Sequence, residues 1–129
     1  MKRSPLRAKS KKRTAEDRIR RRLVEDYLEE RWLCAAKLDL CGVRATDVHE
    51  LVNRSQLPGA QLIPELFLGL CRKCHSYITT HPRWAHAHGF SLHAWEYENY
   101  GEKALFAAHE ARDTCRNISC PYDHWRLDV

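Results

Sequence analysis

The chain has no long hydrophobic run. No segment of its 129 residues approaches the roughly 20 apolar residues that cross a bilayer, which argues against a membrane protein. Its basic opening, residues 1–13, is not followed by the apolar stretch of a secretory signal. Internal repeats are also absent. We therefore expect a cytoplasmic protein, where cysteines are more often metal ligands or reduced thiols than disulfides.

The chain is also short for the core that it must build. A length of 129 residues with 43% hydrophobic content predicts one domain with a small core. Small cores often need a metal ion or disulfides to be stable. The 6 cysteines and 8 histidines indicate the same need.

Positive charge is concentrated at the N-terminus. Residues 1–22 hold half of the 22 Lys and Arg residues, opposed only by Glu16 and Asp17. We interpret residues 1–13 as a flexible basic arm that contacts nucleic-acid phosphates. A solvated tail is the simpler alternative, and the two are compatible because such arms often order only on the polyanion. The basic residues assigned to this role are Lys2, Arg3, Arg7, Lys9, Lys11, Lys12 and Arg13.

Apolar periodicity and turn residues predict the secondary structure. Helices are expected at about 15–35 with Thr14 as N-cap, at 72–80, from Pro82 to His88 with Gly89 just past its end, and at 102–114. Short strands are expected at 45–49 and 66–70, separated by a loop over 53–61.

Cys71 and Cys74 form the clearest metal-binding pattern. A Cys-x2-Cys pair places two thiolates on one turn at the separation that a tetrahedral zinc ion requires. Cys34 and Cys41 bracket a turn just before the first predicted strand and are the natural partners. The sequence predicts a structural zinc site of four cysteines, with buried thiols as the alternative.

The residues around this site suggest a second kind of chemistry. Asp47-Val48-His49-Glu50 ends the first strand, and His75 directly follows Cys74 at the start of a helix. A hairpin and a helix fixed by zinc would bring His49 and Glu50 close to His75. Such a group suits phosphodiester hydrolysis, in which a divalent cation stabilises charge and a side-chain base deprotonates water.

Positions 34–90 resemble the HNH endonucleases, especially small phage and bacterial members. The similar stretches are Cys34-x6-Cys41, residues 44–50, Arg54-Ser55, Leu70-Cys71-Arg72-Lys73-Cys74-His75 and Thr80-His81-Pro82. The resemblance implies an α+β fold with a ββα-metal core, a leading N-terminal helix (nuclease domain 14–90) and a C-terminal helical extension (91–129). It also implies divalent-metal-dependent hydrolysis of DNA, with Mg²⁺, Mn²⁺ or Ni²⁺ as the catalytic cation. Because such nucleases accompany phage genes, a phage-encoded protein acting in a bacterial host with DNA-packaging machinery is compatible with this activity.

The resemblance leaves two assignments open for the catalytic base. A literal alignment makes His49 a metal ligand and Glu50 the base. The other register makes Asp47 a ligand and His49 the base. In both, His75 is implied as a ligand of the catalytic metal. Arg54 is a candidate phosphate contact, with a simple loop charge as the alternative.

Two features depart from the family pattern. The central Asn expected about five residues before Cys71 is missing, and Glu65 is the nearby candidate to replace it. The Gly-Gly pair that often follows Arg-Ser in the family is also missing, because residues 56–59 read Gln-Leu-Pro-Gly. Separately, Thr79 occupies a position that holds a further ligand in some members, and its hydroxyl is a poor ligand. The missing Asn favours a rival interpretation, a non-catalytic zinc-ribbon-like module that binds nucleic acid.

The remaining metal-binding residue types receive plainer interpretations. Cys115 and Cys120, with His109 and His124 on either side, are expected to be incidental thiols beside a terminal helix rather than a second zinc site. Surface or helix-capping roles are expected for His81, His86, His88 and His93. Core positions are expected for Trp84 and Trp95.

Overall fold

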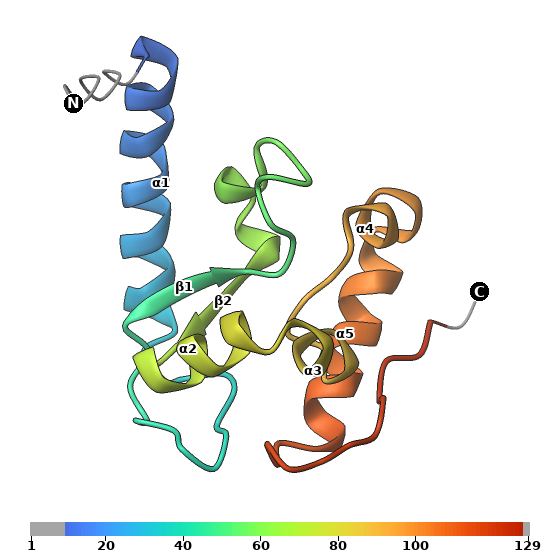
Figure 1. Cartoon of the computed structure of the whole chain (residues 1–129). Helices are drawn as coiled ribbons and strands as arrows, with labels where there is room; N and C mark the ends of the chain where they lie inside the picture. Colours follow the sequence, from blue (N-terminus) through green and yellow to red (C-terminus); the bar gives the residue numbers. More distant parts are fainter. Residues whose placement is uncertain (1–9, 128–129) are drawn as a thin grey trace, which may run out of the picture.

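The computed structural model describes residues 10–127, which form a mixed α and β fold (Figure 1). Its helices are α1 (Lys11–Glu30), α2 (Arg72–Thr80), α3 (Pro82–Ala87), α4 (Ala94–Tyr100) and α5 (Glu102–Thr114), with 3-10 turns η1 (Ala60–Leu62) and η2 (Pro64–Leu66). A single hairpin pairs β1 (Asp47–Glu50) with β2 (Phe67–Leu70). Within the described part of the chain, no helix is both long and apolar enough to span a membrane.

Helix α1 is displaced toward the N-terminus relative to the prediction. Ser10, not Thr14, is the N-cap, and its hydroxyl accepts a hydrogen bond from the Arg13 amide at 3.1 Å. Because the helix starts at Lys11, the predicted flexible arm over 1–13 is too long, and residues 1–9 lie outside the described part. The helix ends at Glu30 rather than near 35, so Trp32 lies beyond it and is 58% exposed.

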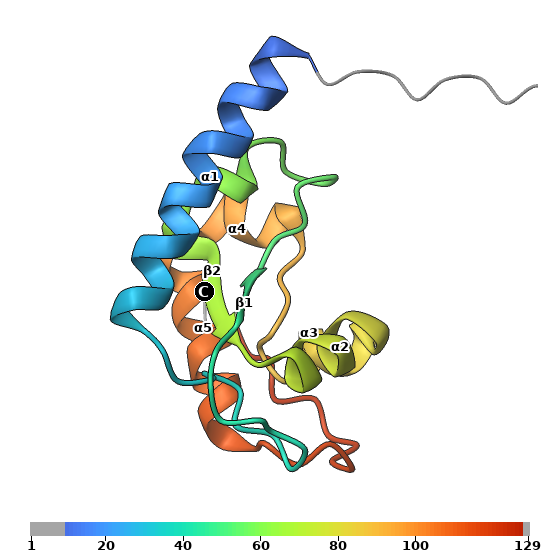
Figure 2. The same cartoon turned by 90° about the vertical axis from the view of Figure 1, so that its left-hand side faces the viewer.

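Helix α1 projects from the rest of the molecule. None of its residues is buried, and its N-terminal end projects beyond the other elements in both views (Figures 1 and 2). Further along, Gln61 of η1 donates to the Glu16 carboxylate at 3.5 Å. The C-terminal half of α1 is anchored by Tyr27, whose hydroxyl donates to the Phe67 carbonyl at 3.0 Å and whose ring meets the Phe67 ring edge-on at 5.7 Å. Helix α1 therefore contributes mainly to the molecular surface and not to the hydrophobic core.

The hairpin lies at the centre of the fold. It is antiparallel with Asp47 opposite Leu70 and Glu50 opposite Phe67, and every residue of β2 is buried. Gly69 permits this burial, because an added Cβ would lie 3.3 Å from the Cβ of Ala45. The segment before β1 is joined to β2 as well, since the Thr46 amide donates to the Leu70 carbonyl at 3.0 Å.

Helices α2 and α3 follow β2; α2 has the predicted bounds, and α3 ends at Ala87, one residue earlier than predicted. His81 separates them, and Pro82 opens α3, where its missing N–H costs nothing. Gly89 adopts φ +81° just past α3, as predicted for a residue that ends a helix in the left-handed region.

The C-terminal part packs through small residues. Helix α5 has the predicted bounds and buries Ala104, Ala107, Ala108 and Ala111. Helix α4, which the sequence did not predict, packs against α5. The described residues after Thr114 form turns and irregular chain, so no helix contains Cys115 or Cys120. Trp84 stacks on Phe90 at 5.8 Å, but Trp95 is 56% exposed and its predicted core position is wrong.

Candidate metal centre and catalytic pocket

Four cysteines converge where the loop before β1 meets the start of α2. Their sulfur atoms all lie within 4.8 Å of one another, and the Cys41 and Cys71 sulfurs are 3.9 Å apart. These residues are Cys34, Cys41, Cys71 and Cys74. All four are free thiols. The cluster could hold a metal ion, as the sequence predicted, because four thiolates are a tetrahedral donor set.

Backbone amides donate hydrogen bonds to two sulfurs of this cluster and stabilise the thiolate form of Cys71. The Gly42 and Cys74 amides donate to the Cys71 sulfur at 3.2 and 3.4 Å, and the Val43 amide donates to the Cys41 sulfur at 3.2 Å. Burial raises the pKa of Cys71, but the two amides outweigh it and bring that pKa down to about 7. Cys71 is thus prepared to act as a metal ligand at neutral pH.

A pocket of about 300 Å³ lies beside this cluster, between β1 and α2. His49 and His75 both line it, with their ring centroids 5.3 Å apart at an interplanar angle of 65°. Glu50 and Asn53 also line the pocket. Residues separated by the whole hairpin thus share one surface.

The tautomer of His49 follows from its hydrogen bond. Its Nε2 lies 2.6 Å from the Phe90 carbonyl oxygen, which can only accept, so Nε2 carries the hydrogen. In the neutral ring, Nδ1 then holds the free lone pair. Burial lowers the pKa of His49 to about 4, against the opposing effect of the Phe90 carbonyl, so the ring is neutral at physiological pH. His49 can therefore accept a proton through Nδ1.

His75 has the opposite arrangement. Its Nδ1 lies 2.9 Å from Asp47 Oδ2, so a neutral ring donates from Nδ1 and keeps its lone pair on Nε2. The Arg72 Nε lies 3.1 Å from the same carboxylate oxygen, and the Thr46 hydroxyl donates to the other. Burial acts to raise the pKa of Asp47, but the His75 and Thr46 hydrogen bonds and the Arg72 charge outweigh it, so that pKa lies below its usual value. A carboxylate that fixes a histidine in this way prepares Nε2 to bind a metal.

Glu50 is held by two arginines. Its Oε1 lies 3.1 Å from Arg54 and 3.5 Å from Arg20 of α1, and its side chain is 17% exposed. Its carboxylate thus pairs with α1 and the following loop, whereas Asp47 pairs with the helix that carries His75.

Asp47, His49 and His75 do not form a complete metal cage. Among residues 10–127 they are not one of the groups whose ligand atoms all lie within 4.8 Å of one another. Thr79 adds no free hydroxyl, because it donates to the carbonyls of His75 and Ser76 at 3.0 and 3.1 Å. A cation here would therefore depend on water and substrate oxygens for most of its ligands, as Mg²⁺ commonly does.

The loop between the strands is braced from an unexpected position. Glu65 lies in η2 at the end of this loop and accepts a hydrogen bond from the Tyr97 hydroxyl of α4. Asn53 braces the loop instead: its carbonyl accepts from the Gln56 and Leu57 amides at 3.0 Å, and its side chain accepts from the Ser55 amide at 3.0 Å. Asn at the start of a polar, Pro-Gly-containing segment is a turn indicator that could have identified this residue.

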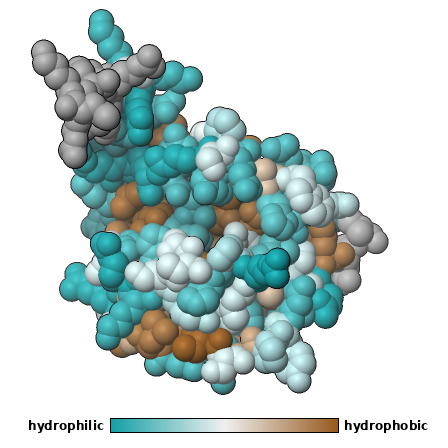
Figure 3. Space-filling view, in the orientation of Figure 1, coloured by the Kyte–Doolittle hydropathy of each residue, from teal (hydrophilic) through white to brown (hydrophobic). Residues whose placement is uncertain are grey.

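The candidate DNA-contacting residues fall in two groups. Lys11, Lys12 and Arg13 are exposed on the first turn of α1, and Arg54 lines the same surface hollow as Lys12 and Arg13. The predicted contacts at Lys2, Arg3, Arg7 and Lys9 lie outside the described residues. The part of α1 that is visible in Figure 3 is mostly hydrophilic.

Of the four histidines predicted to have surface or capping roles, three are partly or fully exposed and one is buried. His81 separates α2 from α3, His93 precedes α4, and His86 bonds Glu96 at 2.8 Å. His88, however, is 0% exposed, so a surface role is wrong for it, although it is the C-cap residue of α3. It is buried because the C-terminal segment folds back over the end of α3, where the His124 amide donates to the Ala87 carbonyl at 2.8 Å.

Comparisons of the chain with protein-family models, with curated proteins and with solved structures give no match.

Proposed function

We propose that this protein is an HNH-type endonuclease that hydrolyses DNA phosphodiester bonds with a divalent cation. The observation that supports it most strongly is the complementary orientation of two histidines in one pocket. His49 is fixed through Nε2 with Nδ1 available, and His75 is fixed through Nδ1 with Nε2 available. A partly buried pair with opposite free nitrogens suits a base beside a metal ligand.

In this proposal His49 is the general base and His75 holds the cation, with Asp47 behind the His75 ring rather than as a direct ligand. His75 would bind it through Nε2, while Asp47 orients the ring and contributes negative charge. The cation, when bound, supplies charge stabilisation at the scissile phosphate and its leaving oxygen. His49 Nδ1 takes the proton of the attacking water. Glu50 is not the base here, because Arg20 and Arg54 hold its carboxylate.

The cysteine cluster has a structural role in this proposal, with zinc as its metal. Cys71 is the N-cap of α2 and Cys74 lies in its first turn, one residue before His75. Cys34 and Cys41 lie in the loop that leads to β1. A zinc ion shared by all four would fix the start of α2 against β1 and so set the spacing between His75 and His49.

DNA would approach along α1 and the loop that carries Arg54. The exposed basic turn of α1 and Arg54 border one hollow. Arg54 also pairs with Glu50, which lines the pocket that contains His49 and His75. Lys and Arg contacts of this kind bind phosphates without reading sequence. A role with phage DNA-packaging machinery stays a prediction from the family resemblance.

A plasmid-nicking assay on zinc-loaded protein tests the proposal. Activity should require added Mg²⁺, Mn²⁺, Ni²⁺ or Co²⁺. His49→Gln should lower the rate about 10²–10⁴-fold, the usual contribution of a general base. His75→Ala should abolish cleavage with zinc retained. His109→Gln is the matched control, since His109 pairs with Asp113 on α5 and does not line the pocket.

Glu50→Gln separates the two candidate bases. It should reduce the rate little if His49 is the base and strongly if Glu50 is. A pH profile alone would not separate them, because the pKa of His49 is about 4 and thus close to that of an ordinary glutamate. Wild-type protein that is folded and zinc-loaded, binds DNA, and cuts with none of these cations would overturn the nuclease proposal in favour of the zinc-ribbon-like binding module.

A further inference from the structure

A second group of metal-ligand types lies where the C-terminal segment meets the end of α3. Two cysteines and two histidines have ligand atoms that all lie within 4.8 Å of one another. The Cys120 sulfur is 3.2 Å from His124 Nε2, and the rings of His88 and His124 meet edge-on with centroids 5.0 Å apart. Ligand atoms around a tetrahedral zinc ion lie about 3.3–3.8 Å apart, given zinc bonds of about 2.0–2.3 Å.

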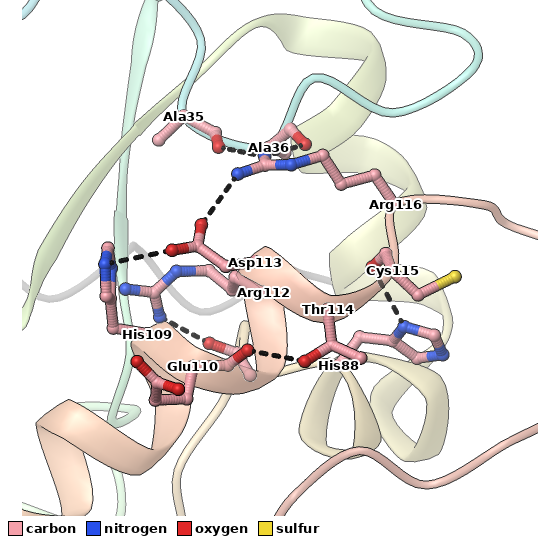
Figure 4. A network of polar contacts seen from close by, with 11 residues as sticks. Ala35, Ala36, His88, His109, Glu110, Arg112, Asp113, Thr114, Cys115 and Arg116 are labelled. Carbon is pink, nitrogen blue, oxygen red and sulfur yellow. Dashed lines mark hydrogen bonds and ion pairs between the residues drawn. The ribbon is translucent and has the colours of Figure 1, made fainter.

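His88 provides an independent indication of a ligand. It is completely buried, and its Nε2 has no hydrogen-bond partner. Its Nδ1 lies 3.4 Å from the Cys115 carbonyl oxygen, a contact that Figure 4 shows, so Nδ1 carries the hydrogen and Nε2 holds a lone pair. The Cys120 backbone also lies near the ring, but it does not form a hydrogen bond with Nε2. A buried acceptor without a partner costs about 1–3 kcal/mol, a cost that a bound cation would remove.

We propose a second structural zinc site in this protein, with the ligands His88, Cys115, Cys120 and His124. Two thiolates and two imidazoles form the donor set of many structural zinc sites. The ligands come from separate parts of the chain. His88 ends α3, Cys115 ends α5, and the other two belong to the irregular segment that follows.

The site has a clear structural purpose. Described residues after Thr114 contain no helix or strand, yet the chain here is held at the end of α3. Cys120 lies in a turn in which its own amide donates to the Asn117 carbonyl at 3.0 Å. The Asn117 side chain accepts from the Ser119 amide at 2.8 Å. A zinc ion would fasten this turn and α5 to α3, so its binding energy would fold the C-terminal segment.

The third close group carries no comparable indication. His86, His93 and Glu96 also lie within ligand distance. Glu96 Oε1, however, lies 2.8 Å from His86 Nε2 and accepts from the His93 amide at 2.7 Å. These hydrogen bonds account for the buried carboxylate without a metal ion.

Metal analysis of the full chain tests the second site. Wild-type protein dialysed against a moderate chelator should retain two zinc ions per chain. The double variant Cys115→Ser/Cys120→Ser should retain one, and His109→Gln, which removes a neighbouring histidine already paired with Asp113, should retain two. A wild-type value of one, or a value of two that the double variant leaves unchanged, would overturn the site.

Cobalt spectroscopy keeps the test decisive if the double variant fails to fold. Wild-type protein loaded with Co²⁺ should bind two ions, one with four sulfur ligands and one with two. Thiolate-to-cobalt absorption should therefore rise in two steps of unequal size. A single step that ends at one equivalent of cobalt would refute the second site while leaving the four-cysteine site intact.

Discussion

Replacing Gly89 by Ala should be severely destabilising, because α5 packs directly on this residue. An ideal Cβ at Gly89 would lie 2.1 Å from the Ala108 carbonyl oxygen, 2.9 Å from its carbon and 3.0 Å from the Cβ of Ala111. The atoms in contact are largely helix backbone, so relief requires α5 to move. That movement would also strain the hydrogen bond that the Arg112 side chain donates to the Gly89 carbonyl at 2.6 Å.

Two effects contribute to the expected cost. Gly89 has φ +81°, where a Cβ costs about 1–2 kcal/mol. Overpacking a core typically costs about 1–3 kcal/mol more, and contact with backbone favours the upper end. We therefore expect Gly89→Ala to lower the free energy of unfolding by about 3–5 kcal/mol. For a domain of this size, that is a fall in Tm of about 10–20 °C.

Gly59→Ala is the matched control. Gly59 has φ +92° but nothing lies within 4 Å of its added Cβ, so only the backbone strain applies. Thermal unfolding of both variants at one fixed zinc concentration separates the two effects. If the two alanine variants lose stability equally, to within about 0.5 kcal/mol, the close packing of α5 on Gly89 is refuted.

Three further predictions concern stability, each measured by urea unfolding. The pKa of His49 is about 4 in the folded protein and about 6.5 in the unfolded chain, so stability should be lost as pH falls from 6.5 to 4. The expected loss at pH 5 is about 2 kcal/mol. The same loss in the His49→Gln variant would contradict this. Arg116→Met should lower the free energy of unfolding by about 2 kcal/mol, because Arg116 donates to the Ala35 and Ala36 carbonyls at 2.8 and 2.6 Å (Figure 4). A loss below about 0.5 kcal/mol would argue against these hydrogen bonds. Tyr27→Phe should cost about 1 kcal/mol through the bond that anchors α1, and no change would show that this bond is dispensable.

Local patterns in the sequence determined the elements around the candidate pocket. The bounds of α2 follow from a Cys-x2-Cys turn and Pro82, and the end of α3 follows from Gly89. Each depends on the conformational limits of a few adjacent residues, which tertiary contacts do not change. The four-cysteine cluster was predictable for a related reason, because few other arrangements of those thiols satisfy one metal ion.

Other features depend on packing between distant segments. Helix α4 has no strong apolar period of its own and is held against α5. The partners of Glu50 include Arg20, 30 positions away on α1, so no strand pattern could assign them.

The second cluster shows the division most clearly. The sequence placed Cys115, Cys120 and His124 near one another but offered His109 as the fourth ligand. The fold turns His109 toward Asp113 on the surface and buries His88 beside the cysteines instead. Spacing along the chain determines which ligands can share a turn. The path of the C-terminal segment over α3 determines which histidine is buried away from solvent. That path is set by burial and backbone hydrogen bonds between residues far apart in the sequence, which only the tertiary structure specifies.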